Sequence, residues 1–222
     1  MRDVTLATFD AVLFDNDGTL TDSTAAVERS WHAWAAHHGV PPDRLGGFHG
    51  VPSRGIVEAV VDPGVDVAQA TADIDRRELR DAEGVVALPG AAAALAAVGD
   101  RAAIVTSAGR ELAVLRLGAA QLEPPAAFVT ADDITRGKPD PQPYLIAARK
   151  LGVDPTRCLV VEDAPAGLEA GRAAGATTLA VTTTSAAGAL EPLADLVVPD
   201  LSSVLFLRDG DGIRVRLRRE PG

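Results

Sequence analysis

The sequence predicts an α/β fold in which helices cover both faces of a parallel sheet and a helical segment is inserted near the start. From about residue 88 onward, short apolar runs of strand length alternate regularly with segments of helix length. Residues 21–87, in contrast, contain three helix-length segments and no convincing strand. Regular alternation implies right-handed crossovers between parallel strands. We therefore predict one core domain from residues 1–20 and 88–222, with residues 21–87 forming a small all-helical cap.

The first predicted strand covers residues 11–14, an apolar run typical of a strand that is buried on both faces. Two carboxylates, Asp15 and Asp17, follow it directly, and side-chain alternation would place them on one side and Asn16 on the other. Gly18 tolerates backbone angles that other residues resist, so it predicts a sharp turn. Carboxylates this close repel unless they share a proton or a cation, which indicates an acid/base pair or a metal site. The alternative interpretation is a polar turn.

Three helices are predicted in the inserted segment, at residues 23–38, 53–61 and 66–80. The first carries Trp31 and Trp34, which the helical spacing places on one face. Two aromatic side chains in this arrangement are typical of a hydrophobic core, and the alternative is that they line a substrate pocket.

The core elements follow in regular order. Helices are predicted at residues 91–98, 110–117, 141–151 and 166–174, and strands at residues 101–106, 127–130, 158–161, 178–181 and 195–198. Gly118, Gly152 and Gly175 directly follow three of these helices and are stop signals. A further strand at residues 213–217 follows a Gly-rich turn, which indicates a terminal hairpin.

Composition limits the possible partners. The chain has 222 residues, a formal net charge of −10 and one cysteine, Cys158. The acidic balance argues against nucleic acid or an anionic lipid surface as a partner, so an anionic substrate has to be captured by local positive charge. A single cysteine excludes an intrachain disulfide and fits a reducing compartment. No apolar run approaches the ~18 residues of a membrane span, and no secretory pattern begins the chain, so we expect a cytoplasmic protein.

Several polar groups follow predicted strands, or lie in loops, at one edge of the sheet. They are Asp15, Asp17, Thr106-Ser107, Lys138 and Glu162-Asp163. Each has an ordinary explanation by itself, as a helix cap, a solvated side chain or a polar turn. In open α/β sheets, however, ligands bind beyond the carboxyl ends of the strands. Together these residues supply carboxylates, hydroxyl and amide donors and a cation, which is the set that phosphoryl transfer requires.

The order of these motifs resembles that of the haloacid dehalogenase-like (HAD) superfamily. The matching stretches are residues 15–23, Thr106-Ser107, Gly137-Lys138-Pro139 and residues 162–167. The resemblance extends over residues 11–182. It implies a Rossmann-like three-layer core, a helical cap inserted after the first motif, and Mg²⁺-dependent chemistry on phosphate monoesters.

The resemblance also implies a role for each residue. Asp15 is expected to be the nucleophile that forms an aspartyl-phosphate, and Asp17 the general acid and then the general base. Thr106 and the Ser107 amide are expected to hold a phosphoryl oxygen, while Lys138 neutralises charge. The expected Mg²⁺ ligands are Asp15, Asp163, the Asp17 carbonyl and, directly or through water, Glu162.

Elementary electrostatics agrees with these roles. A carboxylate that approaches a phosphate dianion faces like-charge repulsion, which a hard divalent cation and Lys138 can offset. Asp15 has to stay ionised, whereas Asp17 has to give a proton to the leaving group and later take one from water. We expect the Thr19 hydroxyl to orient Asp17 by hydrogen bonding, and we assign no role to Asn16.

Within the superfamily, residues 128–133 and the Arg110 that follows Thr106-Ser107 resemble the glycerol-phosphate and deoxysugar-phosphate phosphatases. His49-Gly50 with Arg54 is similar to the substrate-recognition loop of the cap in that branch. We therefore expect a small sugar or polyol phosphate as the substrate, and Ser107, Arg110, His49, Gly50 and Arg54 as its contacts. For Arg110 the alternative is a solvated side chain at a helix start. We expect a monomer or weak dimer.

Two other functions share parts of this pattern. A β-phosphoglucomutase-like mutase has the same core motifs and returns the phosphoryl group to a sugar, and the sequence does not separate it from a phosphatase. A receiver-type signalling domain also uses a phosphorylated Asp with Thr and Lys. Its acidic pair should precede the phosphoacceptor strand, whereas Glu162-Asp163 follow Lys138 here, and it has no helical insertion.

Overall fold

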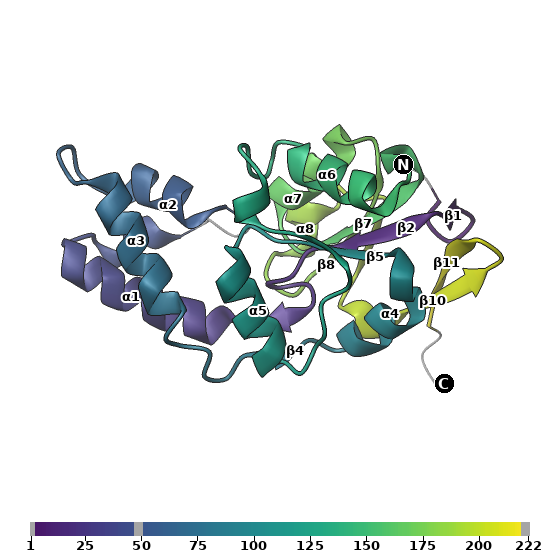
Figure 1. Cartoon of the computed structure of the whole chain (residues 1–222), viewed down its shortest axis with the longest axis horizontal. Coiled ribbons are helices and arrows are strands. Elements are labelled where there is room, and N and C mark those ends of the chain that lie inside the picture. The colour runs from purple at the N-terminus through teal and green to yellow at the C-terminus, as the bar shows by residue number, and fades with distance from the viewer. Residues whose placement is uncertain (1–2, 47–50, 219–222) are drawn as a thin grey trace.

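A computed structural model of the chain describes residues 3–46 and 51–218, and a six-stranded parallel sheet forms its centre (Figure 1). The strand order is β6-β5-β2-β7-β8-β9. The bounds are β2 (Ala11–Phe14), β5 (Ala102–Val105), β6 (Ala127–Val129), β7 (Cys158–Glu162), β8 (Thr177–Val181) and β9 (Leu196–Val198). All residues of β2, β5, β6, β7 and β8 are buried, as expected for apolar strands covered on both faces. The predicted α/β class is confirmed.

Helices cover the two faces of this sheet. They are α4 (Ala91–Val98), α5 (Arg110–Ala119), α6 (Gln142–Leu151), α7 (Pro165–Ala173) and the short α8 (Ala187–Leu190). Alternate residues of β2 separate the two layers: Val12 and Phe14 belong to the cluster with α4 and α5, while Ala11 and Leu13 belong to the cluster with α6 and α7. The core therefore has three layers, and β2 lies inside it.

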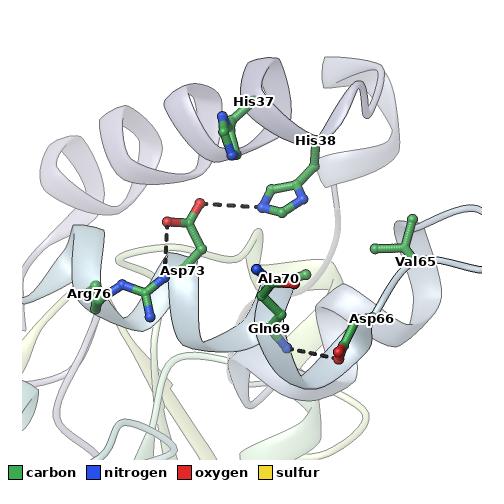
Figure 2. A pocket seen from close by; sticks show the side chains of 8 residues that line it. All are labelled: His37, His38, Val65, Asp66, Gln69, Ala70, Asp73 and Arg76. Carbon is green, nitrogen blue, oxygen red and sulfur yellow. Dashed lines mark hydrogen bonds and ion pairs between the residues drawn. The ribbon is translucent and has the colours of Figure 1, made fainter.

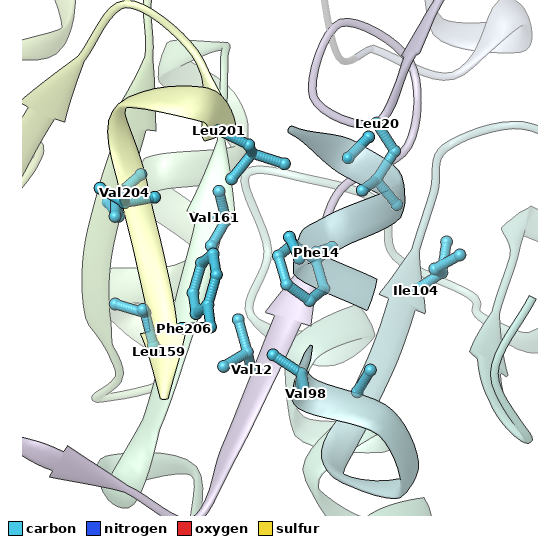
Figure 3. Close-up of a cluster of buried hydrophobic side chains, with 14 of the residues drawn as sticks. Val12, Phe14, Leu20, Val98, Ile104, Leu159, Val161, Leu201, Val204 and Phe206 are labelled. Atoms are coloured by element: carbon cyan, nitrogen blue, oxygen red, sulfur yellow. The ribbon is translucent and has the colours of Figure 1, made fainter. Parts of the chain in front are cut away.

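A small antiparallel sheet closes the α4 side of the core. It comprises β1 (Thr8–Phe9), β10 (Val204–Asp209) and β11 (Gly212–Leu217) in the order β1-β11-β10. Phe206 of β10 meets Phe14 of β2 edge to face, with ring centroids 5.7 Å apart (Figure 3). The predicted terminal hairpin is confirmed, and its apolar face completes the core beside the strand that carries the first motif.

Three inserted helices, α1 (Thr24–His38), α2 (Ser53–Val60) and α3 (Val67–Glu78), lie at the opposite end of the molecule from the hairpin (Figure 1). They surround their own hydrophobic cluster, which includes Trp31, Trp34 and Ile74. Trp34 is fully buried, and its Nε1 donates to the Ala70 carbonyl at 2.8 Å. The interpretation of Trp34 as a core residue is confirmed, and Trp31 packs against it at 5.2 Å.

Two local expectations were wrong. Residues 21–87 were expected to contain no strand, yet β3 (Thr21–Asp22) pairs antiparallel with β4 (Val86–Ala87) where the insertion leaves and rejoins the core. Two-residue strands are too short to give a periodic signal. Gly118 was expected to end its helix, but α5 continues to Ala119, and the left-handed residue is Gln121 with φ of 56°. A helix tolerates an internal glycine at a cost of ~1 kcal/mol.

Among the helices within residues 3–46 and 51–218, none is both long and apolar enough to cross a membrane. The division into a core and a cap at residues 20 and 87 stays a prediction, and the β3–β4 pair lies at both of its boundaries.

Candidate active site

The loop after β2 places the first two carboxylates. The Asp15 N–H donates to the Val161 carbonyl at 2.9 Å, so Asp15 continues the pairing of β2 with β7. Gly18 has φ of 87°, which confirms the predicted turn. A Cβ at Gly18 would collide with the Asp163 carboxylate and lie 2.8 Å from Cγ2 of Thr184. Glycine is therefore required both by the backbone angle and by the close approach of the loop after β7.

Three carboxylates and one ammonium group are buried together at the carboxyl ends of β2 and β7. Oxygens of Asp15, Glu162 and Asp163 lie within 4.8 Å of one another. The Lys138 Nζ donates to Asp15 Oδ1 at 2.5 Å and to the Val105 carbonyl at 3.1 Å, and it pairs with Glu162 Oε1 at 2.6 Å. We call these four residues the carboxylate cluster. One positive charge faces three acidic groups, so the cluster has an excess of negative charge when all three are ionised.

The environment shifts the acidity of this cluster strongly. Burial, followed by the charge of Glu162, raises the pKa of Asp15 well above its ordinary value. The same two causes raise the pKa of Asp163 to about 7. Burial by itself would lower the pKa of Lys138, but Asp15 and Glu162 outweigh it and raise that pKa above its ordinary value. Without a further cation, the fold therefore favours the protonated form of both aspartic acids.

The carboxylate cluster fits a Mg²⁺ ion. Its donors are all oxygens, which a small hard cation prefers, and a divalent charge would relieve the repulsion that raises the two aspartate pKa values. Glu162 Oε1 already accepts from the Tyr144 hydroxyl at 2.5 Å and pairs with Lys138. Asp163 contacts only the hydroxyls of Thr19 and Thr184 among the side-chain hydrogen bonds of the described residues. Asp15 and Asp163 could therefore hold such an ion directly, and Glu162, which has two partners on one oxygen, could contact it through water.

We expect the metal-free protein to lose stability as the pH rises from about 4 to about 7. A carboxyl group whose folded pKa is raised binds its proton more tightly in the folded state, so its stabilisation is present below the unfolded pKa near 3.8 and is lost as the pH rises through the folded value of about 7. Mg²⁺ should bind the ionised form and restore stability at high pH. The measurement is the melting temperature at pH 5 and pH 8, in EDTA and in Mg²⁺. Equal shifts by Mg²⁺ at both pH values would contradict this expectation.

Asp17 lies at the edge of the site and is held by residues other than those expected. Its Oδ1 accepts from the Ser23 hydroxyl at 2.7 Å and forms an ion pair with Arg116 NH1 at 3.1 Å. Asn16, which was expected to point away, donates to Asp17 Oδ2 at 3.3 Å. The Thr19 hydroxyl, which was expected on Asp17, donates to Asp163 at 3.3 Å instead, because the turn at Gly18 carries it toward β7.

A cavity of about 800 Å³ opens between this edge of the sheet and the inserted helices. The core contributes Asp15, Asp17, Thr106, Ser107, Arg110 and Asp163 to its lining, and the inserted segment contributes Glu28, Trp31, His32, Ser53, Arg54, Asp75 and Glu78. Lys138 and Glu162 lie behind this lining, fully enclosed by protein. The Thr106 hydroxyl accepts from the Ala108 N–H at 3.1 Å, which fixes the loop that carries Ser107. The expected phosphate-binding groups thus share one cavity with the inserted helices.

Of the four other predicted substrate contacts, two line this cavity and already have partners within the protein. Arg54 lines the cavity with a side chain that is 70% exposed and pairs with Glu58 on its own helix at 2.8 Å. Arg110 lines it too, but it pairs with Asp133 at 2.7 Å and lies over the Phe128 ring. His49 and Gly50 lie outside the described residues.

The haloacid dehalogenase-like hydrolase family model matches residues 9–175. This chain belongs to that family. Hexitol phosphatase A of Escherichia coli K12 is 39% identical over 212 residues, which cover 90% of this chain and 95% of the relative. Validoxylamine A 7′-phosphate phosphatase of Streptomyces hygroscopicus subsp. limoneus is 37% identical over 210 residues, which cover 88% and 96%. The crystal structure of a hydrolase from Pseudomonas syringae superposes with a TM-score of 0.78 at 28% identity, covering 86% of this chain and 94% of that one.

Family membership decides two of the sequence-based expectations. The resemblance to HAD hydrolases and the assignment as an enzyme of that family are confirmed. The receiver-domain alternative was remote and is now excluded, because the family match spans the inserted helices as well as β2, β5, β6 and β7 of the sheet.

Four residues that contact the candidate site were given no role from the sequence: Glu78, Arg116, Tyr144 and Thr184. Three of them lie in helices and Thr184 lies in a loop after β8, whereas the candidates from the sequence were chosen mainly at strand ends. One signal was present for Arg116, because it shares the buried face of α5 with Leu112, Ala113 and Leu117. A charged residue on an apolar helix face requires a buried partner.

A second hollow of the HAD hydrolase lies between α1 and α3, away from the carboxylate cluster (Figure 2). His37, His38 and Asp73 have potential ligand atoms within 4.8 Å of one another. Asp73 is already paired with Arg77 at 2.9 Å and with Arg76 at 3.5 Å, so its charge is balanced. Two nearby guanidinium groups disfavour a metal cation at this place, and we assign it no metal.

Proposed function

We propose that this HAD hydrolase is a Mg²⁺-dependent phosphatase that cleaves a small sugar or polyol phosphate monoester through an aspartyl-phosphate on Asp15. The observation that carries the proposal is the position of Asp15, which belongs both to the carboxylate cluster and to the lining of the 800 Å³ cavity, with Lys138 Nζ 2.5 Å from its Oδ1. A nucleophile at this junction has charge compensation behind it and room for a substrate in front.

In the first proposed step, an Asp15 oxygen forms a bond to phosphorus while the bond between phosphorus and the ester oxygen breaks. Asp17 gives its proton to the departing alkoxide. In the second step Asp17 takes a proton from water, the water oxygen bonds to phosphorus, and the acyl phosphate bond breaks to restore Asp15. Thr106 and the Ser107 amide hold phosphoryl oxygens in both steps. A Mg²⁺ held by Asp15 and Asp163 would lower the repulsion between carboxylate and phosphate.

The remote part of the cavity supports a polyhydroxylated substrate. Beyond the phosphate-binding groups its lining offers hydrogen-bonding side chains, among them Glu28, His32, Ser53 and Asp75, beside the indole of Trp31. The polar side chains can form hydrogen bonds with substrate hydroxyls, and the indole can pack against the carbon atoms of a sugar or polyol. Two relatives are named for phosphates of a hexitol and of validoxylamine A, which supports the same class.

Incubation with a panel of hexitol, hexose, pentose and glycerol phosphates tests this function. We expect inorganic phosphate from several hexitol or hexose phosphates in Mg²⁺, and none in EDTA. The products are measured both as free phosphate and as sugar isomers. An isomerised sugar phosphate without free phosphate would establish the mutase alternative, and no turnover of any member would overturn the proposed substrate class.

A further inference from the structure

Arg116 connects the proposed general acid to the inserted helices. It lies on α5 of the core and is 5% exposed. Its NH1 pairs with Asp17 Oδ1 at 3.1 Å, and its NH2 donates to Glu78 Oε1 at 3.0 Å. Glu78 is the last residue of α3 and is 7% exposed. One guanidinium group therefore bridges the loop after β2 and the end of an inserted helix.

Packing alone does not account for this arrangement. A buried guanidinium and a buried carboxylate both lose hydration, and an apolar pair of similar volume would avoid that loss. Within the described part of the chain, the buried Nε of Arg116 has no hydrogen-bond partner, so its position leaves one of its own donors unsatisfied. Arg116, Glu78 and Asp17 all line the cavity. The ion pairs are therefore kept at the place where the chemistry occurs.

The contacts of Asp17 show what Arg116 can do there. Oδ1 of Asp17 is held by two donors, the Ser23 hydroxyl and Arg116. Among residues 3–46 and 51–218, Oδ2 has a single longer contact, with Asn16 at 3.3 Å. A carboxylate fixed through one oxygen presents the other in a defined direction, and general acid catalysis depends on that direction.

We propose that Arg116 is a positioning residue for Asp17, and that Glu78 holds Arg116 in place from the inserted helices. The inference rests on the proposed function, because it assigns Asp17 as the general acid and base. It adds that the helices which close the cavity also orient the proton donor, through the chain Glu78–Arg116–Asp17. Arginine suits this place because its planar group reaches two carboxylates at once, which a lysine ammonium cannot do with the same geometry.

The test compares kcat/KM for a hexitol phosphate and for 4-nitrophenyl phosphate, because this constant reports steps up to departure of the leaving group. An alkoxide needs a proton from Asp17, whereas 4-nitrophenolate leaves without one. We expect Arg116→Met to lower kcat/KM about 10²-fold on the hexitol phosphate and less than about threefold on 4-nitrophenyl phosphate. Glu78→Gln should cause a smaller loss of the same pattern. Equal losses on both substrates would overturn the proposal and indicate direct phosphate binding by Arg116.

Two further measurements keep the roles apart. The first is a double-mutant cycle with the hexitol phosphate. In a chain that already carries Asp17→Asn, Arg116→Met should lower kcat/KM no further, and additive losses would overturn the proposal. With 4-nitrophenyl phosphate alone, Arg116→Met should give a burst of 4-nitrophenol followed by slow turnover, because Asp17 also activates water in the second step. Absence of the burst counts against the proposal. This burst does not depend on any sugar substrate, so failure of the proposed substrate class is recognised separately. If Arg116→Met does not fold, Arg116→Lys takes its place, and Arg149→Met on the exposed face of α6 is the control.

Discussion

Replacing Asp15 with Asn is expected to reduce phosphate release by a factor of at least about 10³ while the protein stays folded. The amide has nearly the shape of the carboxylate but is a poor nucleophile toward phosphorus. Because Asp15 is buried beside Glu162 and Asp163, its charge is costly in the fold, as its raised pKa indicates. Removing that charge should leave the free energy of unfolding of the metal-free protein unchanged or increase it at pH 8.

Asp10→Asn is the matched control, since Asp10 precedes β2 as Asp15 follows it. Asp10 pairs with Arg157 at the other end of the strand and contacts no residue of the carboxylate cluster. Turnover of this control should stay within about twofold of the unchanged chain. Phosphate release and urea unfolding are measured for both variants. Full activity in Asp15→Asn would show that another group attacks the phosphate.

The central strands of the fold could be predicted because burial on both faces leaves an unmistakable apolar run. Residues 11–14 and 158–161 are such runs, and both lie inside the sheet. The hairpin was predicted without bounds for its first strand, β10, because the outward residues Leu205 and Leu207 are apolar as well and no alternation marks that strand. The pairing of β3 with β4 depends on the return of the chain after some sixty residues of insertion, which no local pattern records.

The residues of the candidate site also fall into those that the sequence could place and those that it could not. Asp15, Lys138 and Glu162 could be placed together because they follow strands, or precede a helix, at one edge of a predictable sheet. The partners of Asp17 could not be placed, because Arg116 reaches it only through the rotation of α5 about its axis. Glu78 reaches Arg116 only through the packing of α3 onto the core. The positions of buried strands can be read from the sequence more directly than the angles between helices.

Replacing Lys138 with Met is expected to reduce both activity and metal-free stability, with a stability loss that depends on pH. Lys138 is the cation that contacts both Asp15 and Glu162 among the described residues. Removing one partner of a buried ion pair costs about 3–5 kcal/mol, because the remaining charge is left uncompensated. The pKa of Lys138 is raised above its ordinary value, so the lysine is charged throughout the range from pH 5 to pH 8. The pH dependence in this range therefore comes from the carboxyl groups.

At pH 8 the variant should show the larger loss in free energy of unfolding, since Asp15 and Asp163 must then either ionise without the lysine or hold a proton that the unfolded chain has released. At pH 5 the loss should be much smaller, because Asp15 and Asp163, whose pKa values are already raised, bind protons. Mg²⁺ should restore part of the stability at pH 8 by taking over the charge compensation. Lys150→Met, which removes a half-exposed lysine paired with Asp133, is the control. An equal loss at both pH values would mean that Lys138 stabilises the site by packing, and that the cluster is not held together by charge.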